Sequence, residues 1–199
     1  WTLAWQHEYI GENYTAEVGY VPRTNYIKIN PLASRLFFPA TGKVLSHGPR
    51  ASLNYYFSPS MKQTDHENIL LYIVNFRDQS LFDVWAGDVF IELLQPFDPT
   101  NSGKDTLARG TLHHWKAWGV EYISKPQSRF TFGFSTRFGG YYADGSRLNI
   151  IADLGYRFQP FVNIAINTNY NNLDLPLPWG KTDFWLVGPR IDVTMTNKL

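Results

Sequence analysis

Cysteine is absent from this chain of 199 residues. Its absence excludes a disulfide scaffold and a thiolate metal site, because both need cysteine sulfur. No run of about 18 apolar residues occurs either, which excludes a transmembrane helix. The charge is not of one sign: 18 basic residues are scattered among 17 acidic ones. Nothing therefore resembles the basic surface of a nucleic-acid-binding protein.

Catalytic motifs are also missing. The sequence has no G-x-S-x-G elbow, no Walker A loop and no H-E-x-x-H, which would supply a nucleophile, a phosphate cradle or a zinc site. The adjacent His113 and His114 cannot bind one metal ion together, because neighbouring residues of a strand point to opposite faces. His7, His47 and His66 lie on or beside separate predicted strands or loops. We predict no metal and no cofactor, and the sequence favours a protein that is not an enzyme.

Aromatic residues are abundant, with 7 Trp, 12 Tyr and 14 Phe. A soluble core of this size could hold some of them. The two interfacial girdles of a membrane β-barrel would hold many more, because Trp and Tyr prefer the boundary between hydrocarbon and water. The aromatic content therefore favours a barrel.

Alternation of apolar and polar residues runs through the chain, and helical periodicity is hard to find. In the clearest segment, 147–159, Leu148 and Leu154 fall on one face, while Asn149 and Asp153 fall on the other. Extending this pattern predicts about ten strands. They lie near 1–10, 23–37, 48–57, 67–76, 80–94, 110–123, 128–140, 147–158, 161–170 and 182–195.

Strand and link lengths indicate a membrane. Several predicted strands exceed the usual length of about 5–6 residues, and about 9–11 residues cross a bilayer at a tilt. Links after predicted strands 1, 3, 5 and 9 are long, such as 95–109 and 171–181, and most links at the other end are short; 39–47 is an exception. Such asymmetry is typical of a barrel with one periplasmic and one extracellular end. We predict an all-β, antiparallel transmembrane barrel wall, in which odd strands run outward.

The polar faces of the predicted strands would line the lumen of such a barrel. Charges of both signs are interleaved, which favours salt-bridged, water-containing packing over an ion-selective ring of one sign. A solvated sheet face is the alternative. The residues expected on this lumen face are Arg50, Asp88, Glu92, Glu121, Arg129, Arg137, Asp153, Arg157, Arg190 and Asp192.

Two weaker features suggest carbohydrate chemistry. Asp88 and Glu92 could resemble the acid pair of a glycosidase, but four residues along a strand separate their Cα atoms by about 13 Å, too far for that chemistry. We therefore predict structural pairing with arginine. Trp179 follows Pro176 and Pro178 in an external loop, where it is a candidate platform for stacking on a sugar; packing against neighbouring loop residues is the alternative.

Long motifs carry a resemblance to a known family. They are YRFQP (156–160) and LPLPWGKTDFWLVGPRIDVT (175–194), with GENY (11–14), EVGYVPRT (17–24) and LQPFDP (94–99) earlier in the chain. Together they closely resemble the C-terminal region of a Bacteroidota family of large outer-membrane proteins. These are labelled carbohydrate-binding family 9-like domain-containing proteins, and some are labelled membrane-associated hydrolases. The resemblance spans nearly the whole chain.

The resemblance implies a β-barrel domain of unknown function that follows a carbohydrate-binding-like β-sandwich in the full protein. We expect residues 1–199 to be a partial barrel domain, with that module and the closing strands lying outside it. The implied location is the bacterial outer membrane, and the implied partners are lipid, a glycan or an envelope protein complex. No catalytic residue is carried over from the hydrolase label.

Three functions follow as hypotheses. The first is an outer-membrane barrel for glycan handling, transport or envelope assembly. The second is a soluble β-sandwich that binds carbohydrate. The third is a membrane-embedded hydrolase at the extracellular rim, for which Asp144, Asp174 and Asp183 are the candidate carboxylates.

Overall fold

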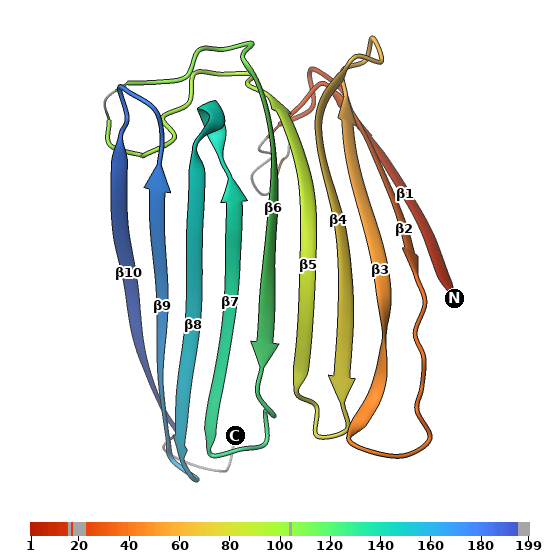
Figure 1. The fold of residues 1–199 in the computed structure, drawn as a ribbon, viewed down its shortest axis with the longest axis vertical. Coiled ribbons are helices and arrows are strands. Elements are labelled where there is room, and N and C mark those ends of the chain that lie inside the picture. Colours follow the sequence, from red (N-terminus) through yellow and green to blue (C-terminus); the bar gives the residue numbers. More distant parts are fainter. Residues whose placement is uncertain (16, 18–22, 104, 195–199) are drawn as a thin grey trace.

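A computed structural model describes residues 1–15, 17, 23–103 and 105–194, and they form one antiparallel sheet of ten strands (Figure 1). Each strand pairs with the next one along the chain, from β1 to β10. The predicted all-β antiparallel fold class is confirmed. The strands are β1 (Thr2–Ile10), β2 (Tyr26–Ser34), β3 (Val44–Phe57), β4 (Gln63–Phe76), β5 (Leu81–Glu92), β6 (Leu112–Ile123), β7 (Phe130–Gly140), β8 (Ser146–Phe158), β9 (Val162–Asp174) and β10 (Lys181–Val193).

The strands are long, as predicted. β3 and β4 each have 14 residues, and β8, β9 and β10 each have 13. In the described sheet, β1 and β10 form the two edges, because each pairs with a single neighbour. The described sheet is therefore open, and its closure by further strands stays a prediction. The described residues contain no helix that is long and apolar enough to cross a membrane.

The links divide the sheet into two ends (Figure 1). We call the end that carries the links 93–111 and 175–180 the long-loop end, and the opposite end, with 77–80 and 159–161, the short-turn end. The link predicted over 171–181 is shorter than expected, because β9 continues to Asp174, which pairs with Lys181. The prediction of a long link after the third strand is also wrong, because β4 begins at Gln63 and pairs there with Phe57. The turn is closed by hydrogen bonds between the backbones of Ser58, Met61 and Lys62.

One face of the sheet is apolar and exposed across all ten strands. Register pairs place its members in continuous rows, and we call it the apolar face. Its exposed fractions are high for large side chains: 63% for Leu70, 54% for Trp118, 45% for Leu154 and 62% for Trp185. Alternation along each strand puts the remaining residues on the opposite face. That opposite face, the polar face, carries most of the charges.

A small core lies on the polar face near the long-loop end. Val89, Trp115 and Ala117 are buried there. The single-turn helix η1 (Tyr142–Asp144), which follows β7, packs onto this core, and the Tyr142 ring lies 4.9 Å from that of Trp115. The β7–β8 link therefore folds over the polar face and positions aromatic side chains above it.

Candidate functional site

The polar face holds a cavity of about 580 Å³. Residues of strands β2 to β8 line it together, so the sheet curls around it. Four basic side chains and five aromatic ones contribute to the lining, against two carboxylates. These residues are Arg23, Lys28, Arg137, Arg147, Tyr56, Phe97, Trp115, Tyr141, Tyr142, Asp65 and Glu67.

The basic side chains of this cavity are held in different ways. Arg23 forms an ion pair with Asp65. Arg147 donates from Nε and Nη2 to the Asn171 amide oxygen at 3.0 and 2.7 Å, and Arg137 lies 5.6 Å from the centre of the Trp85 ring. Among the described residues, Arg137 and Arg147 form no ion pair with a carboxylate. The cavity therefore has an excess of positive charge.

The cavity also has more hydrogen-bond donors than the surrounding side chains have acceptors for. The indole N–H of Trp115 is buried and has no partner among the residues that the structure describes. Burial raises the pKa of the Tyr142 hydroxyl to about 12, and burial likewise raises the pKa of Tyr141. Both hydroxyls therefore keep their protons at neutral pH. The cavity is suited to a ligand that is rich in acceptor oxygens.

Eight of the ten residues predicted to share the lumen face do lie on the polar face by register parity. They are Arg50, Glu121, Arg137, Asp153, Arg157, Arg190 and Asp192, together with Arg129, which precedes β7 and accepts a backbone hydrogen bond from Arg157. Of these, Arg137 lines the large cavity. Asp153, Arg157 and Arg190 line a second hollow of about 520 Å³ near the short-turn end, and Arg190 pairs with Asp192 at 2.8 Å.

The shared-face prediction is wrong for Asp88 and Glu92. β5 pairs without interruption with β6 from Leu81 to Glu92 and with β4 from Leu81 to Ile91. Alternation along the strand therefore puts Asp88 and Glu92 on the same face as the exposed Val84. They belong to the apolar face. The predicted pairing with arginine is also wrong, because Asp88 pairs with two histidines and Glu92 pairs with Lys62 at 2.7 Å.

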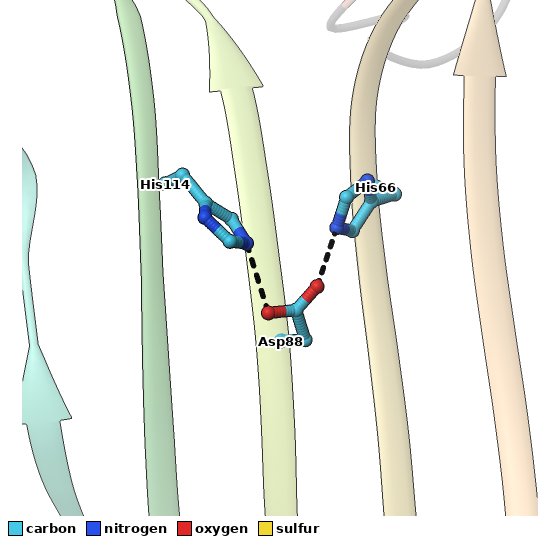
Figure 2. A group of neighbouring side chains, drawn as sticks. All are labelled: His66, Asp88 and His114. Carbon is cyan, nitrogen blue, oxygen red and sulfur yellow. Dashed lines mark hydrogen bonds and ion pairs between the residues drawn. The ribbon is translucent and has the colours of Figure 1, made fainter.

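The Asp88 cluster consists of His66, Asp88 and His114, which come from β4, β5 and β6 (Figure 2). The His66 Nε2 atom lies 2.9 Å from one Asp88 carboxylate oxygen, and the His114 Nε2 atom lies 2.9 Å from the other. One ligand atom from each residue lies within 4.8 Å of the other two. The trio thus has the composition and spacing of a metal-binding group.

The histidine geometry confirms one inference from the sequence and overturns another. His113 and His114 do point to opposite faces: His113 Nδ1 accepts from the Ala143 N–H on the polar face, while His114 meets Asp88. The inference that separate strands keep the histidines apart is wrong for His66 and His114. They are brought together by the register of β4, β5 and β6, which the alternation pattern of a single strand does not contain.

The remaining predicted residues lie at the long-loop end, with Asp144 in η1, Asp174 at the end of β9 and Asp183 near the start of β10. Trp179 is half-buried in the β9–β10 turn, and its indole N–H donates to the Asp105 carbonyl at 2.8 Å. Of the three carboxylates considered for a hydrolase, Asp174 pairs with Lys181 at 3.0 Å. The structure thus gives Trp179 a hydrogen bond that joins two loops.

Comparison with known proteins gave no relative for this chain: no protein-family model, no curated protein and no solved structure matched it. The two faces of the sheet, its long strands and the cavity therefore carry the functional proposal.

Proposed function

We propose that this chain forms part of the wall of a bacterial outer-membrane β-barrel, with the apolar face toward lipid and the polar face toward the interior. The observation that carries the proposal is the contrast between adjacent residues. Leu154 is 45% exposed among other large apolar side chains, whereas Asp153 lies on the opposite face and accepts a hydrogen bond from Asn167. A sheet in water would not leave one whole face apolar and uncovered.

The charges of the apolar face support this orientation. β5 runs toward the long-loop end, and its apolar residues Phe82, Val84 and Ala86 come before Asp88. β6 runs away from that end, and Lys116 comes before the apolar Trp118. The charges thus gather at the long-loop end, while the rest of the face is apolar. Because a charged side chain near the bilayer midplane costs about 2–4 kcal/mol for Arg or Lys, this distribution suits a hydrocarbon layer that ends near Asp88.

Aromatic pairs lie toward both ends of the apolar face. Toward the short-turn end, the rings of Tyr156 and Phe158 are 4.6 Å apart. Toward the long-loop end, Tyr170 and Trp185 are 4.6 Å apart. Two aromatic belts that flank an apolar band are typical of membrane barrels, where such rings occupy the interfaces.

The cavity on the polar face favours a role in handling an acceptor-rich solute such as a glycan. Aromatic rings stack on sugars, and hydroxyl, indole and guanidinium donors match sugar oxygens. We therefore propose glycan handling, transport or envelope assembly as the broad function. A β-sandwich that binds carbohydrate would instead need a second sheet packed on the apolar face.

Fractionation of the full-length native protein tests this proposal. Membranes are washed with high salt and then with alkali, and the detergent extract is run on a gel with and without boiling. We expect the protein to stay in the outer-membrane fraction and to change mobility on boiling, because a closed hydrogen-bonded barrel resists detergent unfolding. Release into the soluble fraction without a mobility change would contradict the barrel and favour the sandwich.

A further inference from the structure

We infer that His66, Asp88 and His114 form a binding site for one divalent transition-metal ion of the Zn²⁺ type, at the long-loop end of the apolar face. Two imidazoles and one carboxylate are ligands that such ions accept, and three protein ligands leave one position for water. The site lies on the face opposite the cavity, and the formation of a barrel does not require it.

The backbone register brings these three residues together from adjacent strands. His66 and His114 both lie opposite Phe90 of β5, one on each side, and Asp88 lies two residues away from Phe90 on the same face. Strands two positions apart are separated by about 10 Å, yet the centres of the two imidazole rings are only 6.1 Å apart. Both rings therefore lean over β5 toward Asp88, as Figure 2 shows.

The donor atoms are close to coordinating distances. Zinc binds histidine nitrogen at about 2.0–2.1 Å and carboxylate oxygen at about 2.0–2.2 Å, so its ligand atoms lie on the order of 3–3.5 Å from one another. Both His–Asp88 separations are 2.9 Å, and all three ligand atoms lie within 4.8 Å. An ion would fit after shifts of a few tenths of an ångström at the carboxylate and a closer approach of the imidazoles.

A neighbouring amide can select the histidine tautomer that a metal needs. The Gln63 side-chain amide nitrogen lies 2.7 Å from His66 Nδ1, and a half-turn of the amide brings its carbonyl oxygen to that place. When the amide oxygen faces Nδ1, it accepts the Nδ1 proton, and the Nε2 lone pair is left free for a metal. Gln63 can therefore orient His66 as a ligand through its second ring nitrogen.

The surroundings of Asp88 also suit a hydrated ion. Lys116 faces Asp88 in the β5–β6 register, and Asn68 faces it from β4. Both Asp88 oxygens nevertheless contact histidines. The Asn68 amide oxygen is buried and lacks a hydrogen-bond partner within the described part of the chain. It is an acceptor available to a water molecule carried by the ion.

Metal titration of the full chain in detergent, without a histidine tag and after chelator treatment, tests the site. We expect one Zn²⁺ per chain by calorimetry and a visible absorption band with Co²⁺ as the probe. His114→Gln and Asp88→Asn each remove one ligand and should weaken binding about a hundredfold. Gln63→Ala keeps all three ligands and should weaken it about tenfold, the usual range for an outer partner.

The matched control is His7→Gln, because His7 is an exposed histidine of the same apolar face on β1. It should bind Zn²⁺ as the unmodified protein does. Far-UV circular dichroism of the β-sheet verifies that each variant is folded, so a loss of binding cannot be a loss of fold. No saturable binding, or equal affinity in the His7→Gln and His114→Gln variants, would overturn the metal site and leave the trio as a hydrogen-bonded cluster. Neither result depends on the barrel proposal.

Discussion

The indole ring of Trp85 lies against Gly119 of the neighbouring strand, so closely that a Cβ atom on residue 119 would stand 2.9 Å from the ring. The same Cβ would stand 1.9 Å from the Thr136 carbonyl oxygen of β7. The guanidinium carbon of Arg137 lies over the Trp85 ring, 5.6 Å from the ring centre. The absence of a side chain at Gly119 thus lets β6 approach both the Trp85 ring and β7.

Replacement of Gly119 by alanine should therefore destabilise the sheet. The Thr136 carbonyl belongs to backbone and cannot turn aside, so the strands must shift, and overpacking typically costs about 1–3 kcal/mol. The free energy of unfolding in lipid or detergent measures the effect. Gly188→Ala on β10 is the matched control, because a Cβ there meets nothing within 4 Å. Equal stability of the two variants would contradict the close approach.

An arginine on either face of β8 should have unequal effects. Leu154 lies on the apolar face and Ile151 lies on the polar face, three residues away. If lipid covers the apolar face, Leu154→Arg should cost about 2–4 kcal/mol near the bilayer midplane, and Ile151→Arg should cost much less. Folding into lipid vesicles under a denaturant series measures both. Similar losses for the two variants would argue against lipid contact.

The Asp98 carboxylate organises the β5–β6 loop and should make its order depend on pH. Burial opposes the charge, but hydrogen bonds outweigh it and lower the pKa of Asp98 to about 2; the donors are the Thr100 hydroxyl and N–H and the Gly103 N–H, at 2.8, 2.9 and 2.8 Å. Because the folded pKa lies below the unfolded value of about 3.9, this stabilisation is present above about pH 4. It is lost as pH falls toward about 2.

Pepsin cleavage of the loop between pH 4.5 and pH 2, corrected for pepsin activity on a reference peptide, follows this change. Cleavage of the unmodified loop should rise as pH falls. In the Asp98→Ala variant, it should be high throughout and nearly independent of pH. A flat profile in the unmodified protein would mean that Asp98 does not order the loop.

Replacement of Trp179 by phenylalanine keeps an aromatic ring but removes the indole N–H. The hydrogen bond to the Asp105 carbonyl is then lost, at a cost of about 1 kcal/mol. Amide exchange at Leu107, which hydrogen-bonds to Phe97 in the same loop, should become several-fold faster. Unchanged exchange would indicate that the indole N–H does not join the loops and is free for a ligand.

Alternation along single strands was enough to predict every strand of the sheet, but it misjudged some of their ends. β4 begins with Gln63, although the alternation pattern places residues 63–66 in a loop. The reason is physical: His66 and Asn68 lie on the apolar face beyond its apolar band, so the strand continues where the alternation of apolar and polar residues stops. Sequence patterns report the environment of a strand and only indirectly its hydrogen bonds.

The candidate sites were harder to predict, because they depend on register between strands. Val84 and Asp88 are four residues apart, so strict alternation along the strand puts both on the apolar face. The sequence therefore contained enough information to place Asp88 correctly. The meeting of His66 with His114 was not predictable, since it needs the β4–β5 and β5–β6 registers together. Likewise, Tyr142 reaches Trp115 through the geometry of the β7–β8 link.

Single-cysteine labelling along β8 tests the orientation of the sheet most directly. The 199 residues contain no cysteine, so each substitution adds one unique thiol within this domain of the full-length protein. Positions 149 to 156 are labelled in turn with a water-soluble maleimide and with a fluorophore that spin-labelled lipid quenches. If lipid covers the apolar face, quenching by lipid is expected at positions 150, 152, 154 and 156, and aqueous labelling at 149, 151, 153 and 155. Aqueous labelling of both sets, without quenching by lipid, would contradict this orientation.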